Sequence, residues 1–260
     1  VCPNNVAHTI GRVKLIDENK SSSSLVDVVV STTGEEDNYT SIAEAFSDGN
    51  INVFVKNGAY VETSDIIIPN YGKLIGEAPG SVTIVLGSGA QIKADGSSGL
   101  KETAGTVGVT RNSSTITGSG TTFTNLSVNN YILIGNNYYK IAAITNATSL
   151  DLDVAYKGPT KSGLSYIAQP MFTGVTINNV VIANSSSTGL YCRAVRHSHV
   201  YDIATVGNST NIHIVDSGDC NFGTITSLDS TVGAGLHVEN CMDLLFNCCK
   251  WVCVILVGIL

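Results

Sequence analysis

Charge of either sign is sparse in this sequence, and positive charge is the scarcer of the two. Asp, Glu, Lys and Arg make up 13% of the 260 residues, about half of the usual share, and 21 acidic residues outnumber 14 basic ones, for a net charge of −7. Phosphate recognition needs a stripe of basic residues, and this sequence has none. We therefore expect no nucleic-acid partner. The apolar run at 251–260, WVCVILVGIL, is too short to span a bilayer, so we expect one more buried strand there and no membrane span.

The spacing of a metal site is also absent. No Cys-x-x-Cys pair with a matching His or Cys set is present, and the Asp pairs 151/153 and 216/219 lack the full oxygen-ligand spacing of a calcium loop. We therefore predict no metal and no cofactor. The seven cysteines are odd in number, and six of them follow residue 190. We expect buried free thiols, with disulfides as the alternative.

What the sequence does contain is a repeat in its last third. Three segments align, LYCRAVRHSHVYDI, IHIVDSGDCNFGTI and LHVENCMDLLFNCC, and their starts are 22 and 24 residues apart. Apolar residues share the first offset (Leu190, Ile212, Leu236), the third (Cys192, Ile214, Val238) and the eleventh (Val200, Phe222, Phe246). A two-residue step is strand periodicity, and repeats this short must stack to bury a core. The pattern predicts a parallel β-helix in which each coil adds a strand about 4.8 Å above the last.

The all-β chain divides into four parts. Residues 1–26 form an N-terminal arm, 27–104 a capping helix and the first coils of the β-helix, 105–158 an inserted small β-barrel-like module, and 159–260 the later coils. Ser41 and Glu44 have the spacing of a capping box, so a short helix begins there, and we expect it to cover the open end of the solenoid. The module has short strands separated by turn residues, including a hairpin at 135–137.

Residues 27–86 also carry a family resemblance. The succession DVVV, YTSIAEAF, VFVKNGAYVE, IIIP and LIGEAPGSVTI resembles the pectin-lyase-like superfamily, most closely the pectin methylesterases, which implies a right-handed parallel β-helix. The module's TGSGTTF, YILIGNNYYKIAAI and SLDLDVAY resemble small β modules of phage tail and large-virus structural proteins. The catalytic motifs of pectin methylesterases, pectate lyases and polygalacturonases are missing. The resemblance therefore implies a fold and transfers no activity.

The candidate catalytic residues share the eighth offset of the repeat: His197, Asp219 and Asp243. In register, the two carboxylates lie about one strand spacing apart. Like charges at that distance separate their pKa values, as an acid and a base require, and the spacing resembles that of retaining glycosidases. The alternative is that Asp and His are ordinary turn residues here, because they hydrogen-bond to local backbone.

The candidate glycan-binding residues share the second offset: Tyr191, His213 and His237, with Arg193 and Glu239 two positions further on. This spacing places them on the outward side of the strands, where a ladder of rings can stack on sugars. The alternative is that ladders of similar side chains are a normal consequence of repetition.

These observations favour a structural protein over an enzyme. We expect a β-helix of a virus particle, as a spike, fibre, tail or minor capsid component, with other virion proteins, further copies of itself and host-surface glycans as partners. Its location would be the virion, assembled in the host cytoplasm. The alternative is a tailspike-type enzyme that cleaves or de-esterifies a polysaccharide, as a hydrolase or lyase. A third interpretation, a secreted or cell-surface adhesin, would need a signal peptide, and the sequence shows none.

Overall fold

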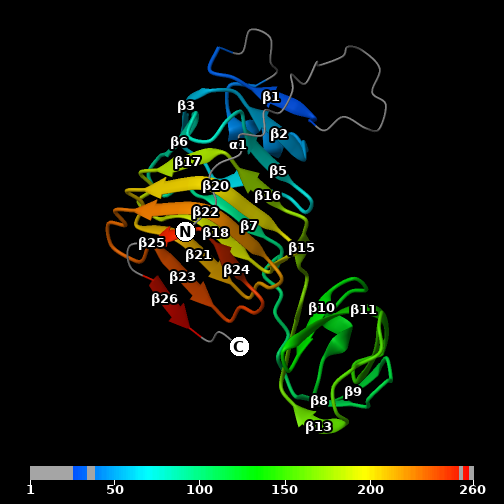
Figure 1. The fold of residues 1–260 in the computed structure, drawn as a ribbon. Helices are drawn as coiled ribbons and strands as arrows, with labels where there is room; N and C mark the ends of the chain where they lie inside the picture. The colour runs from blue at the N-terminus through cyan, green and yellow to red at the C-terminus, as the bar shows by residue number, and fades with distance from the viewer. Residues whose placement is uncertain (1–25, 34–38, 252–253, 258–260) are drawn as a thin grey trace.

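The chain forms a parallel β-helix with a separate small β module (Figure 1). The computed structural model describes residues 26–33, 39–251 and 254–257, so the predicted N-terminal arm lies almost entirely outside the described residues. Each coil of the β-helix contributes strands to three stacks, and its core lies between them. The fold class predicted from the repeats is confirmed.

Two of the stacks belong to one eleven-stranded sheet. Its strands are β1 (Val28–Val30), β2 (Asn52–Val55), β3 (Gly58–Glu62), β5 (Lys73–Gly76), β6 (Val82–Leu86), β16 (Thr176–Asn178), β17 (Val180–Ala183), β20 (His199–Val206), β22 (Asn221–Leu228), β24 (Leu245–Asn247) and β25 (Lys250–Trp251). The first half of β20 pairs with β16 and its second half with β17. Long strands therefore pass from one stack to the next and join the two into one sheet.

The third stack is a six-stranded parallel sheet. Its strands are β4 (Ile66–Ile67), β7 (Ile92–Asp95), β18 (Thr188–Arg193), β21 (Thr210–Val215), β23 (Leu236–Glu239) and β26 (Val254–Val257). The pairing of β26 with β23 adds one more strand to the stack, as the apolar tail predicts. Two short strands, β15 (Phe172–Thr173) and β19 (Val195–Arg196), pair at a corner between the stacks.

The register read from the repeat is the register of the structure. Leu190 pairs with Ile212, which pairs with Leu236, and the columns that begin with Cys192 and Val200 align in the same way. Eight of these nine side chains are buried and the ninth, Phe246, is half-buried, so each column is a ladder of apolar side chains inside the solenoid. Within the Val200 column, the rings of Phe222 and Phe246 stack with centroids 5.1 Å apart.

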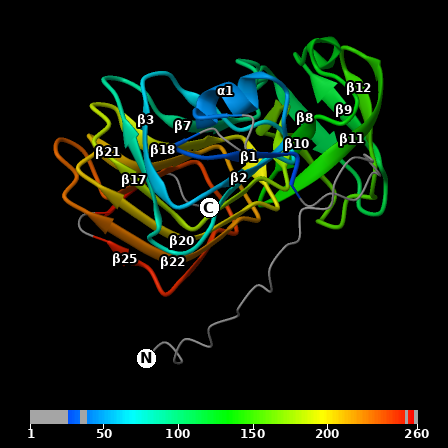
Figure 2. The same cartoon turned by 90° about the horizontal axis from the view of Figure 1, so that it is seen from above.

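The single α-helix of the described residues, α1 (Ile42–Ser47), packs against the first coils. Figure 2 shows it alongside these coils, with the β module to one side. The Ser41 hydroxyl accepts a hydrogen bond from the Glu44 N–H (3.2 Å), as the capping box predicts. The buried carboxylate of Glu62 also accepts hydrogen bonds from the N–H groups of Ile42 (2.5 Å) and Ala43 (3.4 Å). Within the described ranges, no helix has the length and apolar character needed to cross a membrane.

The inserted module is a seven-stranded antiparallel sheet with a hydrophobic core of its own. Its elements are β8 (Thr106–Val109), β9 (Thr115–Ser119), η1 (Phe123–Asn125), β10 (Tyr131–Ile134), β11 (Asn137–Asn146), β12 (Ser149–Leu152), β13 (Lys161–Leu164) and β14 (Tyr166–Gln169). The predicted hairpin joins β10 to β11, with Gly135 at φ +59°. Because β13 pairs with β8 and β14 with β10, the sheet extends to Gln169, beyond the boundary at residue 158 that the sequence suggests.

Four of the cysteines are free thiols, as predicted. Cys192, Cys220 and Cys241 are buried and Cys249 is half-buried. Cys248 differs, because it is disulfide-bonded. Cys2 and Cys253 lie outside the described residues.

Candidate functional site

The His197, Asp219 and Asp243 column lies at a turn on three successive coils. The residues just before them, Arg196, Gly218 and Met242, form parallel bridges, and His199, Asn221 and Leu245 after them pair in the same register. The three residues have φ values of 46°, 53° and 49°. Asp, Asn and His tolerate this left-handed conformation better than most residues, so the turn itself accounts for the residue types.

The two carboxylates of this column differ in their surroundings. Asp219 accepts a hydrogen bond from Arg196 Nε at 3.0 Å, and Arg196 Nη2 reaches the same oxygen, while His197 Nε2 lies 3.8 Å away. Asp243 is exposed and makes no hydrogen bond or ion pair with any other described residue. The structure thus places one ion-paired and one unpaired carboxylate on neighbouring coils. A catalytic role for the set stays a prediction.

Arg196 joins the β-helix to the inserted module. Its guanidinium lies 4.8 Å from the ring centroids of both Tyr131 on β10 and Tyr138 on β11, within range of cation–π attraction. The Tyr138 hydroxyl donates a hydrogen bond to the backbone oxygen of Asp216 (3.3 Å). Burial raises the pKa of Tyr138, which keeps this hydroxyl protonated. The module is therefore docked on the turns that carry the Asp219 column.

A buried ion pair reinforces the same junction. The Asp216 carboxylate is 2% exposed, and Lys101 Nζ lies 2.6 Å from its Oδ1, with Arg193 Nε 3.9 Å from its Oδ2. Burying a carboxylate is costly unless a cation accompanies it, and Lys101 provides that charge from the segment leading into the module. Asp216 and Asp219, considered above as a calcium pair, each have a cationic side chain as their partner instead.

The candidate glycan-binding residues lie side by side on the outward side of the six-stranded sheet. Tyr191 pairs with His213, which pairs with His237, and Arg193 and Glu239 occupy the next outward column through Val215. All five side chains are half-buried. We call this surface, made by Tyr191, Arg193, His213, His237 and Glu239, the histidine face.

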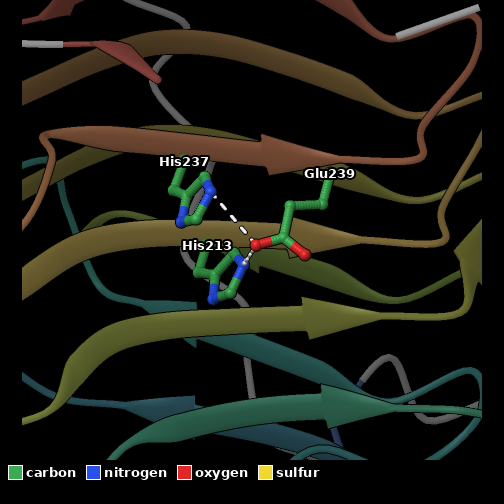
Figure 3. Close-up of side chains that lie close together, drawn as sticks. All are labelled: His213, His237 and Glu239. Atoms are coloured by element: carbon green, nitrogen blue, oxygen red, sulfur yellow. Dashed lines mark hydrogen bonds and ion pairs between the residues drawn. The ribbon is translucent and has the colours of Figure 1, made fainter. Parts of the chain in front are cut away.

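The rings of the histidine face form a continuous ladder. Tyr191 and His213 meet edge to face with centroids 5.4 Å apart, and His213 and His237 stack at 4.4 Å with their planes 3° apart. Glu239 reaches back to both imidazoles, with Oε1 at 3.3 Å from His213 Nε2 and 3.1 Å from His237 Nε2 (Figure 3).

The electrostatics of this face favour the uncharged forms of His213 and Tyr191. Burial, and then the neighbouring His237, lower the pKa of His213, while Glu239 opposes the shift. Burial raises the pKa of Tyr191. The Nε atom of Arg193 is buried without a hydrogen-bond partner among the described residues. The face therefore combines ring surface with polar groups able to bind hydroxyl or carboxylate groups.

The column also includes Lys93, which the repeat did not reveal. Lys93 on β7 pairs with Tyr191, and its ammonium lies 2.6 Å from the Asp65 carboxylate. The segment IKAD at 92–95 aligns with LYCR at 190–193, but the inserted module separates the two coils and hides the period. Aligning strands across the insertion would have found it.

The fold matches known viral proteins at low sequence identity. The tailspike protein gp49 from Pseudomonas phage LKA1 is 14% identical, with a TM-score of 0.51 and a match covering 84% of this chain and 43% of that one. The tailspike gp61 of Pseudomonas phage phi297 is 10% identical, with a TM-score of 0.54 and coverage of 84% and 44%. This chain thus spans less than half of the length of either tailspike. No protein-family profile and no curated protein matches the sequence.

At such identities these likenesses concern the fold alone. The chain has a parallel β-helix fold, as the resemblance of residues 27–86 implies.

Proposed function

We propose that this chain is a β-helix part of a virus particle and that its histidine face binds surface glycans. The single observation that carries the proposal is the aligned ladder of Tyr191, His213 and His237 on an outward sheet face, with Arg193 and Glu239 beside it. Aromatic and imidazole rings pack on the apolar faces of sugars, and charged side chains at the edge bind hydroxyl or carboxylate groups. The β-helix fold shared with two phage tailspikes supports the viral context.

The position of the ladder also supports the proposal. Its side chains project from strands whose pairing fixes their spacing, so little ordering entropy is lost when a ligand binds. Successive rings repeat at the strand spacing, about 4.8 Å, which is close to the length of one sugar unit. In the particle, we expect further copies of the chain and other virion proteins as partners.

A binding screen against immobilised acidic and neutral polysaccharides tests the proposal. We expect saturable binding to at least one polysaccharide, weakened by Arg193→Gln if the glycan is acidic and little changed by it if the glycan is neutral. A folded sample that binds none of the panel would contradict the glycan-binding proposal.

An enzyme remains the second candidate because Asp219 and Asp243 lie on neighbouring coils. The same panel, followed for new reducing ends and for absorbance of unsaturated products, tests it. Cleavage that is lost in both Asp219→Asn and Asp243→Asn would establish an enzyme with its site at this column. Cleavage that survives both substitutions would place the enzyme's site elsewhere, and no cleavage at all would remove this candidate.

A further inference from the structure

The atoms of three side chains on the histidine face converge. Among the described residues, His213, His237 and Glu239 form the one group of three metal-ligating side chains whose ligand atoms all lie within 4.8 Å of one another. Figure 3 shows Glu239 turned back along its strand so that one carboxylate oxygen faces the Nε2 atoms of both rings. The sequence predicted no metal site, because these histidines are 24 residues apart and belong to no local ligand motif.

We propose that His213, His237 and Glu239 bind one divalent transition-metal cation, of which Zn²⁺ is the representative. Metal–nitrogen and metal–oxygen bonds of about 2.0–2.2 Å in a tetrahedron place neighbouring ligand atoms about 3.3–3.5 Å apart. The two nitrogen-to-oxygen distances in the structure, 3.3 Å and 3.1 Å, are close to that edge length. The proposal goes beyond glycan binding and does not depend on it.

The backbone holds these ligands in place before any ion binds. His213 on β21 and His237 on β23 are directly paired across neighbouring strands, and Glu239 follows His237 by two residues on the same side of β23. Only the side chains need to adjust. Because the stacked rings are nearly parallel, their nitrogen lone pairs do not yet point to one centre, so each ring must turn about its Cβ–Cγ bond.

The ligand set is that of an open transition-metal site. Two imidazoles and one carboxylate suit Zn²⁺, Co²⁺, Ni²⁺ or Cu²⁺, whereas Mg²⁺ and Ca²⁺ prefer sites made of oxygen alone. Three protein ligands leave a fourth position for water or another ligand, and the side chains are 22%, 25% and 34% exposed, so solvent reaches them. A bound ion would tie one coil to the next and stabilise the folded state by mass action.

Titration of the tag-free full chain, stripped with EDTA, tests the site. We expect one Zn²⁺ to bind per chain with micromolar or tighter affinity, to raise the Tm, and to be replaced by Co²⁺ with the visible absorption bands of tetrahedral nitrogen and oxygen ligation. Mg²⁺ and Ca²⁺ should not compete.

Three substitutions and one matched control locate the ion. His213→Gln, His237→Gln and Glu239→Gln should each weaken binding by at least about tenfold. His199→Gln, which changes an exposed histidine on β20, should leave the affinity unchanged. Glu239→Gln keeps the size and a hydrogen-bonding oxygen, so it separates loss of a ligand from loss of the fold. Absence of Zn²⁺ binding by the folded chain, or binding that survives the first three substitutions, would overturn the proposal and leave the cluster as a hydrogen-bonded ladder only.

Discussion

The imidazole rings of His213 and His237 stack with their planes 3° apart and their centroids 4.4 Å apart, although 24 residues separate them in the sequence. Their strands are neighbours in a parallel stack, so each residue faces its counterpart on the next coil. The same register that aligns Ile212 with Leu236 inside the solenoid aligns these rings outside it. A repeat that exists to build a core therefore also orders the outer surface.

The apolar ladders form the core of the solenoid, and Phe222 tests how much they contribute to the stability of the fold. Phe222 is 1% exposed and stacks on Phe246, so Phe222→Ala should lower the free energy of unfolding by about 3–5 kcal/mol. Leu245→Ala, on the neighbouring coil but 53% exposed, should cost less than about 1 kcal/mol. Urea unfolding followed by circular dichroism measures both. Equal losses for the two variants would contradict the ladder as the stabilising element.

Backbone conformation explains the residue at position 243. Asp243 is exposed, has φ +49° and makes no hydrogen bond or ion pair with another residue of the described ranges. Asp243→Gly should keep wild-type stability within about 0.5 kcal/mol, whereas Asp243→Val should cost about 1–2 kcal/mol because a β-branched residue is strained there. Thermal unfolding of the two variants tests this. If the Gly variant is the less stable of the two, the side chain rather than the turn is what the fold requires.

Arg196 holds the module on the β-helix. Arg196→Met removes the charge between Tyr131 and Tyr138 and the partner of Asp219, and it should weaken docking by about 1–3 kcal/mol. Hydrogen exchange should then speed up in β10 and β11 while the six-stranded sheet keeps its protection. Arg111→Met changes an exposed arginine of the module, and it should alter neither the docking of the module nor the hydrogen exchange of β10 and β11. Unchanged exchange in the Arg196 variant would show that docking depends on other contacts.

The buried thiols predict how the protein responds to alkaline pH. Burial raises the pKa of Cys220 to about 11 and that of Cys241 to about 12, well above the value of about 8.5 for an unfolded thiol. The unfolded chain therefore loses these protons first. The stability that the folded state gains from keeping these two thiols protonated is fully present below about pH 8.5, and it falls as the pH rises from there toward 11 or 12.

Two measurements check the thiol prediction. N-ethylmaleimide should label Cys249 before Cys220 and Cys241 in the folded protein, and all three after unfolding in urea. The double variant Cys220→Ala, Cys241→Ala should lose less stability than the wild type between about pH 8 and pH 10. Rapid labelling of Cys220 and Cys241 in the folded state would contradict their burial.

The repeat predicted most of the β-helix because its register is a local property of spacing. The columns beginning with Leu190, Cys192 and Val200 followed from alignment alone, and so did the outward placement of Tyr191. Periodicity of this kind determines which residues face the core, and it repeats on every coil.

Contacts between parts that do not repeat could not be predicted in this way. The placement of Arg196 between Tyr131 and Tyr138 depends on how the module docks, and no spacing in the sequence encodes that. The role of Glu62 at the start of α1 and the extension of the module to Gln169 are likewise long-range pairings. The disulfide at Cys248 falls under the alternative that the sequence left open, because spacing alone does not determine which cysteines pair.

The central claim is that the histidine face binds glycans. Its most direct test is the affinity of the Tyr191→Ala variant for the best-binding polysaccharide, with Tyr201→Ala as the matched control on the other sheet. By calorimetry, loss of a stacking ring should weaken binding by about 1.4–2.8 kcal/mol, roughly tenfold to 100-fold, in the Tyr191 variant, and leave the Tyr201 variant unchanged. Equal affinity of Tyr191→Ala and the wild type, with the fold intact, would show that the histidine face is not where the glycan binds.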